Sequence, residues 1–243
     1  MDKSSIAVAW VYLSASPLSG LTVTLVAYGI AYRLYSYAKF NPLLNPVLTA
    51  VILLITVLLL SGISYKDYFE GGQFIHFLLG PATVALAIPL YHQITKLKKI
   101  WLPITISLLA GVVIGALSSI SIAWLLDASV LTQLSFAPKS VTAPIAMGIS
   151  ESIGGLPALT AILVVSTGII GATIGTKLFE LLRIDDDSIK GVAMGVTAHG
   201  IGTARAFQVS SEMGAFSGLA MALSAFSTAV ILPWLLAFMG FIP

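Results

Sequence analysis

The sequence predicts an all-α polytopic membrane protein, and composition is the first reason. Hydrophobic residues make up 58% of the 243 residues and charged residues 9%, against roughly 25% charged residues in an ordinary soluble domain. Spacing is the second reason, because six intervals without Asp, Glu, Lys or Arg each exceed the roughly 20 residues that a helix needs to cross hydrocarbon. The chain is therefore expected to form a single membrane domain, 1–243.

About seven transmembrane helices account for the apolar intervals. They are predicted near 17–37, 45–63, 71–94, 101–126, 156–178, 189–211 and 214–239. Between the fourth and fifth lies 128–155, which holds Pro138, Pro144 and Gly154 together with the charged Lys139 and Glu151. This composition suits a re-entrant segment that lines a cavity, and an eighth crossing is the alternative.

Cationic residues sort by loop and predict the orientation. They follow the first, third and fifth spans: Arg33 and Lys39; Lys96, Lys98 and Lys99; Lys177, Arg183 and Lys190. The second and fourth connections are mostly acidic. The positive-inside rule then puts the N-terminus outside and the C-terminus in the cytoplasm.

An internal repeat is predicted over about 40–126 and 138–239. Similar short runs open the second and fifth spans at 46–51 and 157–162, and glycine-containing runs interrupt the third and sixth at 80–85 and 202–207. Because three crossings separate the two openings, the copies run in opposite directions. Inverted repeats with broken helices are typical of secondary transporters, which hold substrate near the middle of the membrane.

The two breaks predict an anion site. Gly80 and Thr83 belong to the first break; in the second, Gly202 precedes Thr203, which is expected to cap a new half-helix carrying Arg205. Half-helix N-termini present unpaired N–H groups, and an arginine fork suits a carboxylate. The alternative is that Arg205 is a structural tie to Glu212 or Glu151.

Histidines near the breaks are candidates for substrate contact or proton transfer. His199 precedes the second break and His76 the first, and the pKa of an unperturbed histidine lies near 6.5. For His199, a neutral imidazole bonded to a freed backbone carbonyl is an equal alternative.

The re-entrant segment supplies further candidates. Lys139, Ser140 and Thr142 offer one cation and two hydroxyls for an anion, and Glu151 is a candidate for proton coupling. The alternative is that Lys139 lies at the headgroup level with Glu151 as its salt-bridge partner. Glycines at 168, 171 and 175, and at 111 and 115, are spaced for close helix packing.

Several function classes lack their residues. The chain has no cysteine, three histidines and a net charge of +2, and it contains none of the zinc-protease, P-loop or serine-hydrolase motifs. We expect no enzyme activity, no cofactor or metal, and no nucleic-acid partner.

Four blocks resemble the LrgB/CidB family of membrane proteins: 77–91, 138–146, 167–172 and 198–205. The resemblance implies an antiholin-like modulator of murein hydrolase activity and autolysis, in the bacterial inner membrane. It also implies similarity to the LrgB-like half of the plastidial glycolate/glycerate translocator, and hence an LrgA-like partner or a homo-oligomer.

Two functions follow from these expectations. The first is a secondary transporter of small monocarboxylates such as pyruvate, glycolate or glycerate, proton-coupled and working by alternating access. The alternative is a holin- or antiholin-like protein that forms oligomeric lesions or modulates a partner. Only the carrier gives Arg205 a role beyond folding.

Overall fold

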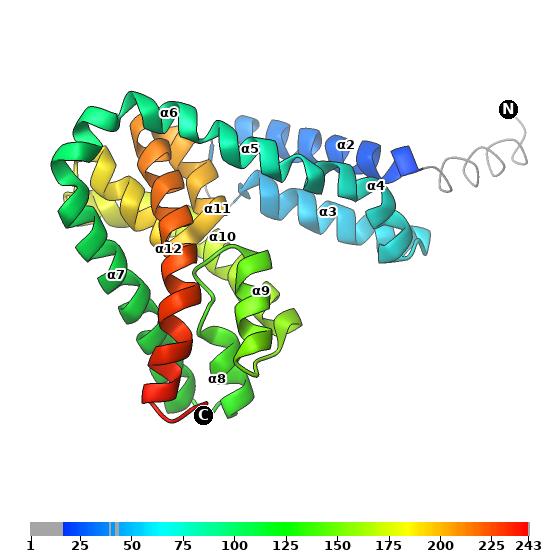
Figure 1. Cartoon of the computed structure of the whole chain (residues 1–243). Coiled ribbons are helices and arrows are strands. Elements are labelled where there is room, and N and C mark those ends of the chain that lie inside the picture. Colours follow the sequence, from blue (N-terminus) through cyan, green and yellow to red (C-terminus); the bar gives the residue numbers. More distant parts are fainter. Residues whose placement is uncertain (1–16, 39, 42–43, 243) are drawn as a thin grey trace, which may run out of the picture. The chain divides into compact units, whose positions relative to one another are not determined.

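The computed structural model describes residues 17–38, 40–41 and 44–242, and within them every regular element is a helix (Figure 1). The prediction of an all-α fold is confirmed for this part of the chain. The helices form two compact units, residues 1–85 and residues 86–243, which are described separately. Among the described residues, four stretches are helical, long and apolar enough to cross a membrane: Tyr65–His92, Ile94–Leu125, Pro157–Leu181 and Ser211–Phe238.

The described part of the first unit contains α2 (Pro17–Tyr37), α3 (Pro46–Ser61), α4 (Tyr65–Phe77) and α5 (Leu79–Ala85). α3 begins after Asn45, whose side chain accepts a hydrogen bond from the N–H of Val47, and ends at Gly62 with a left-handed backbone (φ 69°). α2 packs against α3 and α4. The hydroxyls of Thr24 and Tyr68, 2.7 Å apart, fix α2 to α4.

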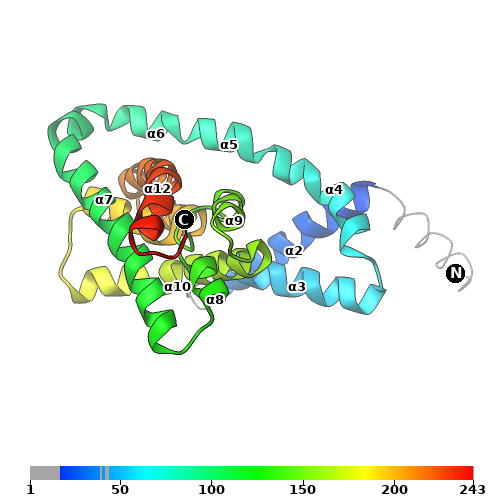
Figure 2. The ribbon, with the colours of Figure 1, turned by 60° about the horizontal axis from the view of Figure 1, so that its bottom comes forward.

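The second unit contains α6 (Ala87–His92), α7 (Ile94–Leu125), α8 (Val130–Phe136), α9 (Ala143–Ser152), α10 (Pro157–Leu181), α11 (Asp187–Val209) and α12 (Ser211–Phe238). Figure 2 shows α7 and α12 from a second direction. α7 is kinked at Ile100 (φ −117°, ψ 17°), three residues before Pro103. Proline has no N–H and clashes with the carbonyl one turn earlier, so the helix bends there.

α11 reverses direction at His199 and is therefore a hairpin. The backbone of His199 is non-helical (φ 41°, ψ −135°). The Ser210 hydroxyl donates to a carboxylate oxygen of Asp187 over 2.6 Å, although an unbroken helix of that length would separate them by about 34 Å. The first arm (187–198) and the second arm (200–209) thus lie side by side, with both ends of α11 at the same end of the unit.

Two sequence expectations are corrected here. The segment 189–211 is not one straight span, and the break lies at His199 rather than at Gly202. The reason is packing: a Cβ added to Gly202 would lie 2.6 Å from the Ala198 Cβ and 3.0 Å from the Met194 carbonyl oxygen. Gly202 lets the two arms touch and does not itself break the helix.

α8 and α9 form a second hairpin, whose tip is 137–142. The hydroxyl of Thr160, in the first turn of α10, lies 3.0 Å from the carbonyl oxygen of Ser135 and 2.7 Å from the hydroxyl of Ser150. Ser135 is at the end of α8 and Ser150 is near the end of α9. The segment 128–155 thus turns back on itself; its re-entrant placement in a membrane stays a prediction.

The two hairpins start from opposite ends of the second unit. The ammonium of Lys96, in the first turn of α7, contacts Asp186 and Glu212 at the starts of α11 and α12; we name this the Lys96 end. α7 finishes just before Asp127, and the α8–α9 hairpin starts there; this is the Asp127 end. α12 also finishes at the Asp127 end, since Leu236 packs in one buried cluster with residues of α8.

Candidate functional site

The tip of the α11 hairpin is held in a strained backbone conformation. A non-glycine residue with the φ and ψ of His199 costs on the order of 1–3 kcal/mol, so the surroundings must impose it. Its side chain is 4% exposed, and Nε2 lies 2.9 Å from the carbonyl oxygen of Val164 in α10. Because a carbonyl only accepts, Nε2 carries a proton and donates it. The acceptor belongs to α10 and is not a carbonyl freed by the break, so this bond differs from the structural alternative stated for His199; a role in substrate contact or proton transfer stays a prediction.

Glycines let α10 and α7 approach the first arm closely. A Cβ added to Gly168 would lie 2.7 Å from the imidazole of His199, and one added to Gly171 would lie 2.6 Å from the Cβ of Ala198. On α7, a Cβ at Gly111 would meet Val196 at 2.9 Å. The packing role predicted for these glycines is confirmed.

Thr203 supports the reversal from inside the hairpin. Its hydroxyl donates to the carbonyl oxygen of His199 over 2.8 Å and lies 2.9 Å from the hydroxyl of Ser217 in α12. The predicted role as a helix N-cap is wrong, because Thr203 lies inside the second arm and its hydroxyl bonds the carbonyl four residues earlier. Thr203 is buried.

The tip of the α8–α9 hairpin carries Lys139, which is partly buried between the buried residues Pro138 and Val141. Its Nζ donates to the hydroxyl of Ser140 over 3.3 Å. The ion pairs among the described residues are Lys96–Asp186, Lys96–Glu212 and Lys190–Asp187. Within that part of the chain no carboxylate, that of Glu151 included, pairs with Lys139.

The two tips converge at the same depth. Ser140 faces Gly115, while Val196 of the α11 first arm faces Gly111, and four residues of α7 span about 6 Å. His199 follows Val196 by three residues in the direction of Gly115. This depth is near the middle of the apolar part of α7, 101–125.

Arg205 lies on the second arm, six residues after the tip, toward the Lys96 end. It is partly buried, and Nη1 donates to the side-chain oxygen of Gln208 over 3.0 Å. Glu212, one of its two alternative partners, is engaged by Lys96. A role for Arg205 in binding substrate stays a prediction.

Of the other candidates, Thr142 belongs to the tip of the α8–α9 hairpin, and the rest lie away from the tips or outside the site described here. Thr142 precedes α9 and its side chain makes no capping bond, and Glu151 is exposed near the other end of α9. His76 and Gly80 belong to the first unit, in α4 and α5. The side chain of Thr83 lies outside the described residues.

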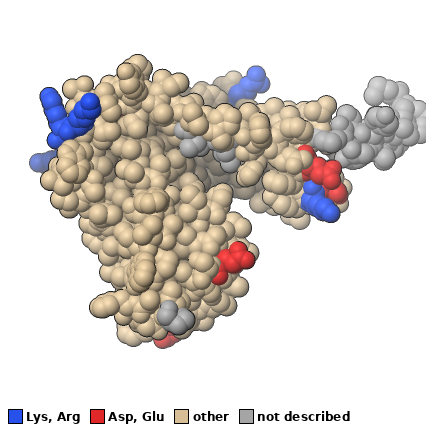
Figure 3. Space-filling model, in the orientation of Figure 1, with Lys and Arg blue, Asp and Glu red and all other residues tan. Residues whose placement is uncertain are grey.

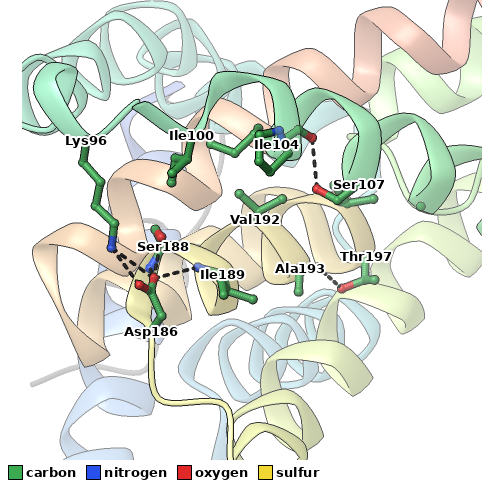
Figure 4. A pocket seen from close by; sticks show the side chains of 13 residues that line it. Lys96, Ile100, Ile104, Ser107, Asp186, Ser188, Ile189, Val192, Ala193 and Thr197 are labelled. Carbon is green, nitrogen blue, oxygen red and sulfur yellow. Dashed lines mark hydrogen bonds and ion pairs between the residues drawn. The ribbon is translucent and has the colours of Figure 1, made fainter. Parts of the chain in front are cut away.

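A groove of about 560 Å³ runs between α7 and the first arm of α11 (Figure 4). Its walls are mostly aliphatic, with Ile104 and Val192 facing one another across it. The hydroxyls of Ser107 and Thr197 point to carbonyl oxygens of their own helices, those of Ile104 and Ala193. The groove is therefore apolar except at the Lys96 end, which makes it a poor site for a small anion.

A cluster of ion pairs lies at the Lys96 end of the groove. Lys96 Nζ lies 2.9 Å from a carboxylate oxygen of Asp186 and 2.7 Å from one of Glu212. These partners are 90 and 116 residues from Lys96, so sequence reasoning missed them. No group of three or more His, Asp or Glu among the described residues is placed to hold a metal ion.

Hydrogen bonds lower the pKa of both carboxyl groups at the start of α11. The Ser188 hydroxyl, then the Lys96 ammonium, holds the pKa of Asp186 well below its usual range. The Ser210 hydroxyl is the main cause of the lowered pKa of Asp187. Both groups therefore stay ionised at neutral pH.

Comparisons with known proteins identify the family. A model of the LrgB-like family matches residues 24–238. An antiholin-like protein LrgB of Bacillus mycoides is 34% identical over 231 residues, 93% of this chain and 98% of the relative, and one of Bacillus cereus agrees to the same extent. A Bacillus subtilis protein, the uncharacterized protein YwbG, is 42% identical over 196 residues, 80% of this chain and 87% of its own length. No solved structure matches. The chain therefore belongs to the LrgB-like family of membrane proteins.

Proposed function

We propose that this chain has the antiholin-like role for which its relatives are named, and that its molecular activity is transport of small monocarboxylates. The relatives' names support the first part. The meeting of two opposed hairpin tips carries the second. Non-helical backbone at membrane depth is tolerated where it is buried in protein or lines a cavity, and broken helices mark the substrate sites of many carriers.

The chemistry of the tips suits a small anion. Lys139 supplies a cation, and the hydroxyl of Ser140 lies beside it. Pyruvate, glycolate and glycerate are small and carry one carboxylate each. His199 and Glu151 are the candidates for proton coupling.

The hairpins also suggest a topology for the second unit. α7, α10 and α12 would cross the membrane, and the two hairpins would enter from opposite faces. Figure 3 shows Lys and Arg side chains gathered over the α6–α7 turn, so the positive-inside rule favours the Lys96 end in the cytoplasm. The C-terminus would then lie outside, contrary to the orientation expected from seven straight spans, in what we take to be the bacterial inner membrane.

The order of these elements supports alternating access. A long helix followed by a hairpin occurs twice, at 94–152 and 157–209, and the second copy runs opposite to the first. Each hairpin would separate the tips from one side of the membrane. The repeat expected over 40–126 and 138–239 involves the first unit and stays a prediction, as does an LrgA-like partner or a homo-oligomer.

The alternative activity is that of a holin- or antiholin-like protein that forms an oligomeric lesion or modulates a partner; the relatives' antiholin-like names support modulation. Uptake of labelled pyruvate and glycolate into proteoliposomes separates the two, with and without a pH gradient. A carrier gives saturable uptake that unlabelled substrate competes. Arg205→Ala is expected to lower it, whereas Arg33→Ala, an exposed arginine of α2, leaves it unchanged. Unselective, unsaturable leakage would favour the lesion.

A further inference from the structure

We infer that the ammonium of Lys139 binds the carboxylate of the substrate, and that His199 is a positioning residue that holds the opposing tip against it. The inference rests on the proposed transport function and names its site. It moves the main carboxylate contact from Arg205, which the sequence favoured, to the tip of the α8–α9 hairpin.

The surroundings of Lys139 lack a counter-charge. Buried Pro138 and Val141 lie on either side of it in the chain, and the one hydrogen bond given for its ammonium goes to the neutral hydroxyl of Ser140 at 3.3 Å. None of the ion pairs of the described residues includes Lys139. A charge away from water is costly unless it is paired. A small anion at the tip would supply the missing charge.

The other cations of the second unit are less suited to this role. Lys96 already contacts two carboxylates, so a substrate would have to compete with both. Arg205 donates to Gln208 and lies about 9 Å along the second arm from the tip. Lys139 alone among these three lies at the depth where the two hairpins converge.

His199 sets the position of the facing tip. Its Nε2–H bond to Val164 and the absence of a side chain at Gly168 seat the imidazole against α10. Val164 also belongs to the buried cluster that contains Val141, next to Ser140 in the first tip. The imidazole of His199 is thus bonded to a residue of the same buried cluster that holds the first tip.

Because the chain has no cysteine, the charge at position 139 can be removed and restored chemically. The test measures binding of labelled pyruvate and glycolate to the purified full chain in nanodiscs. Lys139→Cys should bind about 10- to 100-fold more weakly, the range for losing a hydrogen bond to a charged group. Aminoethyl methanethiosulfonate adds an ammonium to the cysteine and should restore most of the affinity, while the sulfonatoethyl reagent should not.

Lys177→Cys is the matched control, since Lys177 is exposed on α10; its binding should not change with either reagent. Mass spectrometry reports the modified fraction. If Lys139→Cys binds the carboxylates as tightly as the wild type, the inference is overturned and the proposed function stands. The same holds if Lys139→Cys loses binding and complete aminoethylation does not restore it. Failure of the wild type to bind either carboxylate would overturn both.

A second variant tests the positioning role. His199→Gln should weaken binding, and a cysteine at Ser140 should then react faster with a thiol reagent, because the facing tip no longer covers it. Unchanged reactivity of Ser140→Cys in the His199→Gln background would refute the positioning role, whatever happens to binding.

Discussion

The two hairpins of the second unit reach the same depth by different constructions. α11 turns at one residue, His199, and its arms touch through glycine. The α8–α9 hairpin turns through 137–142, and a cluster of hydroxyls fixes both of its arms to α10, at Ser135 and Ser150. One hairpin depends on close backbone packing, the other on buried hydrogen bonds.

This difference implies that the hairpins fail differently when altered. A larger side chain in place of a glycine of α11 should destabilise this hairpin, because the neighbouring residues leave no space for the added atoms. Loss of a hydroxyl should destabilise the α8–α9 hairpin, because buried polar groups without partners are costly. The cluster of Lys96 with Asp186 and Glu212 is a third kind of contact, partly exposed and correspondingly weaker.

Labelling of single cysteines from one side of the membrane tests directly whether α11 is a hairpin. Cysteines placed singly at Asp185 and Val209 should be labelled by an impermeant reagent from the same side, because both lie at the ends of one hairpin. A cysteine at Asp127 should be labelled from the opposite side. Labelling of positions 185 and 209 from opposite sides would restore a straight sixth span and remove the α11 hairpin.

Gly202→Ala should cause the largest loss of stability. The added Cβ meets Ala198 and the backbone of Met194, and overpacking of this kind costs about 1–3 kcal/mol. The matched control is Gly148→Ala in α9, where nothing lies within 4 Å of the added Cβ and alanine favours a helix by up to about 1 kcal/mol. Unfolding in mixed micelles measures both; equal effects would contradict the difference in packing.

Thr160→Val should destabilise the other hairpin by about 1–2 kcal/mol, because it leaves the hydroxyl of Ser150 and the carbonyl of Ser135 with one partner fewer. Thr105→Val is the control, since that hydroxyl is exposed and bonds only the carbonyl of Trp101 in its own helix. If proteolysis of the α8–α9 hairpin were no faster in Thr160→Val than in the control, the hydroxyl cluster would not hold its arms.

The sequence predicted one hairpin and missed the other for a physical reason. Pro138 and Pro144 mark 128–155 as poor helix, because proline lacks an N–H. No proline lies near His199, and Gly200 and Gly202 indicate a break there without specifying that the chain turns back. The reversal of α11 depends on contacts such as Ser210 with Asp187, which local propensity does not encode.

The candidate site was predicted in its parts but not in its assembly. His199 and Lys139 stood out because ionisable residues are rare inside a membrane protein. The two residues come together only because 189–211 turns back halfway, and the sequence analysis expected one straight span there. The partners of Lys96 lie too far along the chain for any local pattern, although Asp186 followed by Ser188 is a recognisable helix start.

The smallest predicted effect concerns the Lys96 end. Asp186→Asn keeps a side-chain oxygen to cap α11 but loses the ion pair with Lys96. Because the Asp186 side chain is 43% exposed, the free energy of unfolding is expected to fall by only about 0.3–1 kcal/mol. The folded-state pKa of Asp186 is lowered, so its contribution is complete at neutral pH and is lost as pH falls below about 4. The melting temperatures of wild type and Asp186→Asn should therefore differ at pH 7 and converge in acid. A difference that persisted in acid would mean that the asparagine disturbs the cap, and the ion pair would not be what secures this end of the α11 hairpin.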